Sequence, residues 1–324
     1  MNKKKILSAL LTISILTGAL SGCGKGSDKA KEVHIGYFNN VTHAQALLMK
    51  ADGSLEKSLG EDVSVTWTAF NAGPAEVEAL FAGDIDIGYI GPVPAISANV
   101  KSKGDVSVLA GATKAGSVLV KRKGSDIESV ADLAGKNVAI PQIGNTQHLI
   151  LLALLSENGL KPVSEGGDVN VTAVANADVA NVMERGDIDA ALVPEPWGAT
   201  LLAEDAELVL DEKQVFADGA YDVAVVVVRN EFMEENKDIV DTFMKEHENA
   251  TMVISEGGEA LDTINKELDE ATGKSLSKEV IEEAFSRIQV SNDYDEASLN
   301  KFAEISKEQD FIQELPDDSL LVKR

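Results

Sequence analysis

The chain has a single cysteine, Cys23, among its 324 residues, and only 29 lysines and arginines against 54 aspartates and glutamates. One thiol excludes an intramolecular disulfide, because it has no partner within the chain. The formal net charge of −25 excludes nucleic-acid binding, because a strongly acidic surface repels phosphate. This charge favours a soluble monomer. It does not exclude a small anionic ligand, since exposed charges are screened beyond about 8 Å at physiological salt.

Catalytic motifs are absent from the sequence. It contains no Gly-x-Ser-x-Gly turn for a serine nucleophile, no Walker loop for phosphate, and no Gly-x-Gly-x-x-Gly after an expected strand. The four histidines include no pair at HxxxH spacing, which a metal site on a helix would use. We therefore expect a protein that is not an enzyme and that carries no cofactor and no metal.

Long hydrophobic runs are scarce, and the longest lies at the N-terminus. Lysines at positions 3–5 precede an apolar run over residues 6–19, which is too short to span a bilayer as a stable helix. The run ends in Leu20-Ser21-Gly22-Cys23, which resembles a bacterial lipobox. We predict a signal peptide over residues 1–22, a lipid on Cys23 and a flexible tether over residues 23–32. The alternative for Cys23, a buried free thiol, fits poorly with the glycines beside it.

One sequence unit occurs twice, with Gly-Asp-Ile-Asp cores that begin at Gly83 and Gly186. In each copy a short amphipathic helix is followed by glycine, which adopts the left-handed conformation at a helix end without a Cβ penalty. A short apolar run then predicts a buried strand, and a proline-rich loop ends the copy at residues 91–94 or 194–197. A chance recurrence explains one such unit more easily than two with matching flanks. We infer two lobes of similar construction.

The order of expected strands and helices indicates an α/β fold with two similar lobes, each built on a mainly parallel sheet. Lobe I is expected over residues 33–119 and 217–324, and lobe II over residues 120–216. Two crossings between them form a hinge. Helices are expected near the C-terminus over residues 236–255, 259–270, 277–287 and 296–308.

Three expected helices begin at glycine-containing loops: Gly73-Pro74, Gly91-Pro92 and Gly144-Asn145-Thr146. The first N–H groups of a helix lack partners, and the helix dipole favours negative charge, so each start could bind an anion. The alternative is that Asn145 or Thr146 simply caps its own helix. Ligands of open α/β sheets lie beyond the carboxyl ends of the strands, so these helix starts should line one crevice.

Four side chains near these loops have two interpretations each. His43 and His148 could donate hydrogen bonds to a ligand or could be ordinary surface histidines. Glu195 could pair with a ligand amine or cap a helix that starts at Trp197. Trp197 could pack on a ligand or fill the interface between the lobes.

Several motifs together are similar to the nitrate/sulfonate/taurine family of ABC-transporter substrate-binding proteins. They are the lipobox, Gly36-Tyr37, Gly73-Pro74, the stretches 83–88 and 91–95, Leu133-Ala134-Gly135-Lys136-Asn137-Val138-Ala139, and Glu195-Pro196-Trp197. The resemblance runs from about Val33 to Leu210. It implies the type II periplasmic-binding fold, capture of a small solute between two lobes, and delivery to a membrane permease with its ATPase. It also implies an extracytoplasmic location with a lipid anchor in the cell membrane.

The resemblance implies a set of ligand-binding residues, which together with their neighbours are Asn39, Asn40, Thr42, His43, Asn71, Gly73, Gly91, Pro92, Gly144, Asn145, Thr146, Gln147, Glu195 and Trp197. The first-lobe loops contain no arginine, so backbone N–H groups with Asn, Thr and His would bind the ligand. We expect an organic sulfonate or taurine-like anion, with an amine near Glu195 as one possibility. Nitrate, bicarbonate and a pyrimidine precursor of thiamine are alternatives. A ligand sensor or an enzyme on the same fold are the alternative classes.

Overall fold

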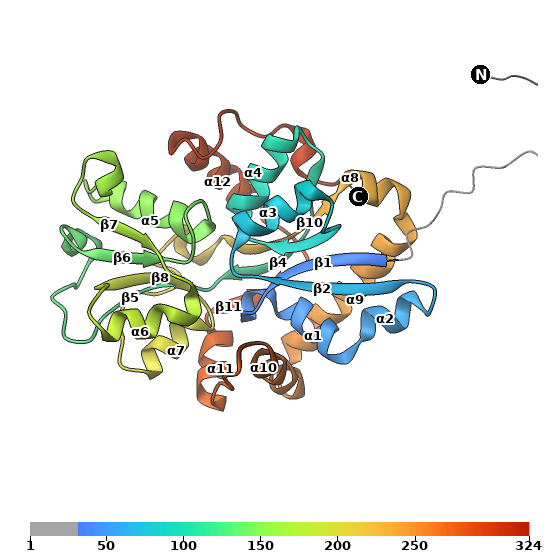
Figure 1. Cartoon of the computed structure of the whole chain (residues 1–324), viewed down its shortest axis with the longest axis horizontal. Helices are drawn as coiled ribbons and strands as arrows, with labels where there is room; N and C mark the ends of the chain where they lie inside the picture. Colours follow the sequence, from blue (N-terminus) through green and yellow to red (C-terminus); the bar gives the residue numbers. More distant parts are fainter. Residues whose placement is uncertain (1–31, 324) are drawn as a thin grey trace, which may run out of the picture.

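The computed structural model describes residues 32–323, which form two mixed β-sheets with helices around them (Figure 1). The predicted signal peptide, Cys23 and all but the last residue of the predicted tether lie outside this range. That last residue, Glu32, already belongs to the first strand.

The first sheet has six strands in the order β11-β4-β10-β3-β1-β2. Their bounds are β1 Glu32–Phe38, β2 Ser64–Phe70, β3 Ile87–Ile90, β4 Val106–Ala115, β10 Asp222–Arg229 and β11 Ile288–Val290. The second sheet has five strands in the order β7-β6-β8-β5-β9. Their bounds are β5 Ser117–Lys121, β6 Asn137–Ile140, β7 Asn170–Ala173, β8 Ala190–Pro194 and β9 Glu207–Leu210.

Most strands of each sheet run in one direction, as expected, but both sheets also contain antiparallel pairs. Strands β1, β2 and β3 are parallel, as are β6, β7 and β8. In contrast, β10 is antiparallel to both of its neighbours, and so is β5. The physical reason is the crossing between sheets. A strand that has just crossed starts at the end of its new sheet that faces the other sheet, so it runs away from that end. The remaining strands run toward that end, except the short strand β11, which is antiparallel to β4.

The chain crosses between the sheets at Gly116, the single residue that separates β4 from β5. It returns in the segment between β9 and β10. The first crossing therefore lies three residues before the predicted lobe boundary at residue 119. The division into lobes itself stays a prediction.

The first copy of the duplicated unit forms α3, β3 and α4, and β3 belongs to the six-stranded sheet. The second copy forms α6, β8 and α7, and β8 belongs to the five-stranded sheet. The helices are α3 Gly73–Ala82, α4 Pro92–Ser102, α6 Val179–Glu184 and α7 Trp197–Ala203. Gly83 and Gly186 follow α3 and α6 with φ of 78° and 77°, in the left-handed region where a Cβ would be strained. Strands β3 and β8 are fully buried, as short apolar runs predict.

The core is organised on both faces of β10. Val223, Val225 and Val227 belong to one hydrophobic cluster, whereas Ala224, Val226 and Val228 belong to another. This alternation follows from the two-residue period of a strand buried on both faces. The other helices are α1 Ala44–Asp52, α2 Ser54–Leu59, α5 Thr146–Glu157, α8 Asn230–Glu235, α9 Lys237–Glu256, α10 Glu259–Thr272, α11 Lys278–Ser286 and α12 Glu296–Glu308.

The C-terminal helices contact the layers of both sheets (Figure 1). Helices α9 and α10 pack against α1 beside the six-stranded sheet, whereas α11 packs against α7 beside the five-stranded sheet. Helix α12 lies against α4 and α5. The C-terminal segment therefore holds the two halves of the molecule together in addition to the two strand crossings.

Candidate ligand-binding site

Three helices begin at one cavity between the two sheets. Gly73 is the first residue of α3, Gly91 precedes α4, and Asn145 and Thr146 start α5, and all four line this cavity. The other lining residues are Phe38, Asn40, Thr42, His43, Pro94, Gln147, Pro194 and Val223. Strands β1, β3 and β8 end with their carboxyl ends at the cavity, where the rule for open sheets places a ligand.

The loops from the two sheets touch each other across this cavity. A Cβ added to Gly91 would lie 2.4 Å from Oγ1 of Thr146, and one added to Gly144 would lie 3.6 Å from Cγ of Pro74. The cavity has a volume of about 20 Å³, enough for about one water molecule. In this structure the loops from the two sheets leave no room at the cavity for a solute larger than water.

The start of α5 combines an ordinary cap with free donors. The Asn145 side chain accepts a hydrogen bond from the backbone N–H of His148 at 2.8 Å, so this residue caps its own helix, as one interpretation predicted. Its amide donates to Gln147, which donates to Ser117 at 3.0 Å and so connects α5 with β5. Thr146 differs: its buried Oγ1 has no hydrogen-bond partner among residues 32–323. A ligand anion would satisfy this hydroxyl.

His43 is a neutral imidazole in the cavity wall. Its Nδ1 accepts a hydrogen bond from the backbone N–H of Phe38 at 3.1 Å, and the two rings stack with centroids 4.3 Å apart. Because Nδ1 is an acceptor, the ring proton lies on Nε2, which can donate to a ligand. Complete burial lowers the pKa of His43 to about 3, so the ring stays uncharged at neutral pH.

Glu195 and Trp197 do not line the cavity. The Glu195 carboxylate is fully buried, accepts the backbone N–H of Ala199 at 2.9 Å and pairs with Arg287 at 2.8 Å. Its role is therefore to cap α7, the second interpretation, and its ligand-amine role has no support in this geometry. Burial raises the pKa of Glu195 to about 7. Trp197 packs against the hydrophobic cluster under β8, which includes Val179 and Met183.

The remaining predicted residues lie close to the cavity without lining it. Asn39 is half-buried beside Asn40, and Asn71 is exposed just before α3. Pro92 is buried in the first turn of α4, and Gly144 borders a neighbouring groove with Pro74. His148 also lies outside the cavity: it stacks on Phe311 with centroids 5.2 Å apart, and burial lowers its pKa to about 4. The structure thus brings together eight of the fourteen predicted residues.

Sequence reasoning missed four lining residues: Phe38, Pro94, Pro194 and Val223. The two prolines were signalled by the loops that end the duplicated unit, and Phe38 by its place at the end of the first strand. Val223 had no such signal, because its place depends on how the returning strand inserts into the first sheet.

Asp222 is a buried carboxylate beside Val223 that sequence reasoning also missed. Its Oδ2 accepts the backbone N–H of Asp295 at 2.7 Å, whereas its Oδ1 is buried with no partner among residues 32–323. Burial raises the pKa of Asp222 to about 6, so it is largely ionised at neutral pH. It is a buried carboxylate with one oxygen left to accept a hydrogen bond, and it does not itself line the cavity.

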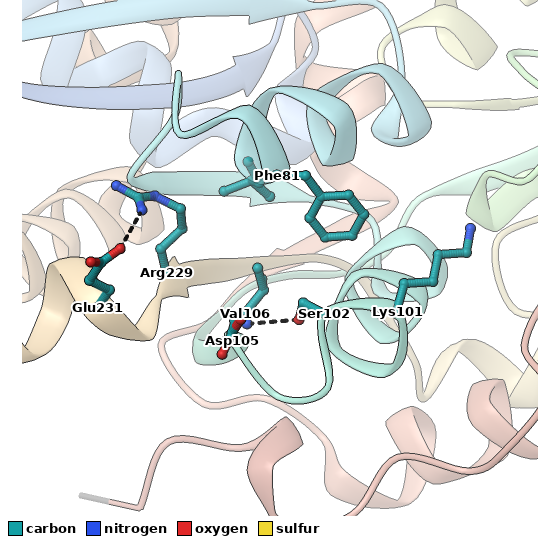
Figure 2. Close-up of a pocket in the computed structure, with 8 residues that line it drawn as sticks. Phe81, Lys101, Ser102, Asp105, Val106, Arg229 and Glu231 are labelled. Carbon is teal, nitrogen blue, oxygen red and sulfur yellow. Dashed lines mark hydrogen bonds and ion pairs between the residues drawn. The ribbon is translucent and has the colours of Figure 1, made fainter.

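A larger hollow, of about 610 Å³, lies between the C-terminal ends of α3 and α4 and the start of α8 (Figure 2). None of the predicted ligand residues lines it. Its guanidinium, Arg229, already binds Asp86 at 2.7 Å, the carbonyl of Ile85 at 3.1 Å and Glu231 at 3.5 Å. The other cation of the hollow, Lys101, is exposed on α4, and no predicted ligand residue lines the hollow, so we do not assign the ligand site to it.

The model of the NMT1-like family matches residues 26–266, well over half of the chain. The chain belongs to this family. It is 33% identical over 218 residues to the taurine-binding periplasmic protein of Escherichia coli K12, a match that covers 67% of this chain and 65% of that relative's length. The family resemblance predicted from the sequence is therefore confirmed.

Solved structures of the same fold agree with this membership. The alkanesulfonate-binding protein SsuA of Xanthomonas axonopodis pv. citri, solved with MOPS, is similar with a TM-score of 0.72 and 22% identity, over 91% of this chain and 97% of that chain. A ligand-binding component of an ABC-type import system from Staphylococcus aureus, solved with zinc, is similar with a TM-score of 0.74 and 18% identity. The match covers 90% of this chain and 96% of that chain. These likenesses confirm the periplasmic-binding fold.

No helix within residues 32–323 combines the length and the apolar character needed to cross a membrane. Over the same range, no three His, Cys, Asp or Glu side chains are grouped so as to hold a metal ion.

Proposed function

We propose that this protein is the solute-binding component of an ABC importer and that it captures an organic sulfonate between two lobes, residues 33–119 with 217–324 and residues 120–216. One observation carries the proposal: the starts of three helices meet at one cavity. Helices α3 and α4 lie beside the six-stranded sheet, and α5 lies beside the five-stranded sheet. Helix starts supply free N–H groups and a favourable dipole for an anion. Closure over the anion would bring donors from both lobes onto it.

The chemistry of the cavity wall favours a sulfonate among small anions. None of the twelve lining side chains is charged at neutral pH, because His43 is held neutral. The wall offers backbone N–H groups, two asparagines, a glutamine, two threonine hydroxyls and the Nε2 proton of His43. A sulfonate is a monoanion at every accessible pH, and its oxygens only accept hydrogen bonds, so neutral donors can satisfy it. The names of the relatives support this class: one binds taurine, and MOPS carries a sulfonate.

A ligand amine would have a different partner from the one first expected. The acceptors of Glu195 are occupied by Arg287 and Ala199, whereas Oδ1 of Asp222 has no partner. Asp222 directly precedes Val223 of the cavity wall. We assign the recognition of an amine, as in taurine, to Asp222.

Isothermal titration calorimetry with the purified chain tests both parts of this proposal. The panel is taurine, isethionate (the hydroxyl analogue of taurine), ethanesulfonate, nitrate, bicarbonate and a hydroxymethylpyrimidine. We expect micromolar affinity for sulfonates, about −8 kcal/mol, and a preference for taurine over isethionate that Asp222→Asn removes. Glu195→Gln is the matched control and should keep the preference. No heat with any sulfonate would refute the ligand class.

We further propose that the chain is anchored outside the cytoplasm by a lipid on Cys23 and passes its solute to a permease driven by an ATPase. The Leu20-Ser21-Gly22-Cys23 sequence supports the anchor. Labelling of cells with an alkyne fatty acid should mark the wild-type protein in the membrane fraction and leave Cys23→Ala unlabelled. Label on the Cys23→Ala variant would contradict the anchor.

A further inference from the structure

Glu76 is a carboxyl group buried one helical turn beyond the anion-binding start of α3. It lies three residues after Gly73, which lines the cavity, and it is completely buried. Neither of its oxygens has a hydrogen-bond partner within residues 32–323. An isolated buried carboxylate is costly, and a protein usually avoids it by pairing or neutralising the group.

Two glycines on neighbouring strands make room for this carboxyl group. A Cβ at Gly36 of β1 would lie 2.2 Å from its Oε1, and so would a Cβ at Gly88 of β3. Gly36 lies two residues before Phe38, and Gly88 lies three residues before Gly91, and both of these later residues line the cavity. Helical side chains point toward the start of their helix. The carboxyl group therefore occupies a notch in the sheet immediately behind the cavity wall.

The groups around this notch leave Glu76 without a compensating charge. The charged or titratable side chains on the surrounding elements are Glu32, His34 and Tyr37 of β1, Asp86 before β3, Tyr89 of β3, Asp222 and Arg229 of β10, Glu78 of α3 and Lys101 of α4. Asp86 and Arg229 bind each other at 2.7 Å, and none of these nine groups bonds to Glu76. Burial raises the pKa of Glu76 well above its ordinary value, because no partner stabilises the charged form of the carboxyl group.

We propose that Glu76 must stay protonated for the solute anion to bind, so that capture at this cavity is coupled to one proton. This inference rests on the proposed capture of an anion. An ionised Glu76 would place a negative charge behind the same helix start that binds the ligand, and it would oppose the favourable dipole there. Like charges about one helical turn apart beside a buried carboxylate repel strongly enough to weaken binding on the order of tenfold to a hundredfold.

The test is the pH dependence of isethionate affinity between pH 6 and pH 9.5, because isethionate has no group that titrates there. We expect wild-type affinity to fall at least tenfold toward the alkaline end, and Glu76→Gln to bind with nearly constant affinity. Glu78→Gln, an exposed glutamate on the same helix, should behave as the wild type does. A wild-type protein with constant affinity, or a Glu76→Gln variant with the wild-type slope, would overturn the inference while leaving sulfonate binding intact. Absence of binding in every variant would remove the proposed function and the inference together.

A second measurement on the wild-type protein alone covers the case in which Glu76→Gln does not fold. At pH 8 the buried acids Glu195 and Asp222 are mostly ionised, since their pKa values are about 7 and about 6. The infrared carbonyl band of a protonated carboxylic acid should therefore persist at pH 8 because of Glu76. It should disappear over the same pH interval in which affinity falls. A protein without this band at pH 8 would contradict the inference.

Discussion

Nη1 of Arg287 lies 2.8 Å from Oε1 of the fully buried Glu195, and this ion pair joins the end of α11 to the end of β8. Glu195 pairs in this way with a residue 92 positions later in the chain. The sequence alone left two interpretations of Glu195, a ligand contact and a helix cap. In the structure the carboxylate links the C-terminal helices to the five-stranded sheet.

Arg287→Ala should therefore destabilise the fold, and more so at high pH. Glu195 has a folded pKa of about 7, above its ordinary 4.5, so its contribution to stability is full below pH 4.5 and declines as the pH rises to 7. Without Arg287, an ionised buried carboxylate remains, which costs about 3 kcal/mol or more. We expect Arg287→Ala to lower the free energy of unfolding by this amount at pH 8. The decrease should be smaller at pH 5, where Glu195 can protonate.

Urea denaturation of both proteins at the two pH values measures this difference. Arg185→Ala is the matched control, because its ion pair with Asp187 is exposed and should be worth about 1 kcal/mol or less at either pH. Equal losses for Arg287→Ala at pH 5 and pH 8 would show that Glu195 does not titrate as described.

Thr146→Val should change affinity and stability in opposite directions. The buried Oγ1 of Thr146 has no partner within residues 32–323, so its removal should leave the free energy of unfolding unchanged or raise it by up to about 1 kcal/mol. The affinity for a sulfonate should fall about tenfold, because a hydrogen bond to the anion is lost. Calorimetry and thermal unfolding of the same sample measure both effects.

Thr200→Val provides the opposite pattern as a control. The hydroxyl of Thr200 already donates to the carbonyl of Pro196 at 2.9 Å, outside the cavity. Its loss should cost about 1 kcal/mol of stability and leave affinity unchanged. If Thr146→Val were destabilised in the same way with unaltered affinity, the hydroxyl would be structural and not a ligand donor.

Two substitutions of His43 should separate its two nitrogens. In His43→Asn the new Oδ1 can still accept from the Phe38 N–H, but the Nε2 donor is gone, so affinity should fall about tenfold with little loss of stability. In His43→Gln the donor position is kept and the Phe38 N–H loses its acceptor, so stability should fall by about 1–3 kcal/mol. If His43→Asn lost stability and His43→Gln lost affinity instead, the ring proton would lie on Nδ1.

The acid side of the stability profile offers a further check on His43. Its pKa is about 3 in the folded protein and 6.5 ordinarily, so its contribution is full above pH 6.5 and is lost as the pH falls toward 3. The stability of the wild-type protein relative to His43→Asn should therefore fall between pH 6.5 and pH 4. His148, Glu195 and Asp222 titrate in both proteins, so their contributions cancel in this difference. Chemical denaturation across this range measures the two slopes.

Features that depend on neighbouring residues were predictable from the sequence. The glycines that end α3 and α6 and the buried strands after them follow from local conformation and apolar spacing. Helices α9 to α12 follow from their amphipathic pattern, and their observed bounds lie within a few residues of the predicted ones. The meeting of Gly73, Gly91 and Thr146 followed from one rule about the carboxyl ends of strands.

Features that depend on distant residues were not predictable in this way. The antiparallel insertion of β10 and the short strand β11 depend on how the chain returns from the five-stranded sheet. The exclusion of Glu195 from the cavity depends on Arg287, and nothing near Glu195 in the sequence indicates that partner. The unpartnered carboxyl of Glu76 could not be separated by sequence from the many exposed acids on helices, because only the packed sheet shows its notch.

The packing of Glu76 against Gly88, in the notch behind the cavity, leads to a further prediction. Gly88→Ala places a Cβ 2.2 Å from Oε1 of Glu76, and the buried carboxyl has little room to move, so we expect a loss of about 1–3 kcal/mol in the free energy of unfolding. Glu76→Ala opens the same space from the other side. The double variant should therefore be more stable than the sum of the two single losses predicts, by about 1 kcal/mol or more. Denaturation of the four proteins in this cycle measures the coupling. Additive losses would mean that the carboxyl group does not occupy the notch.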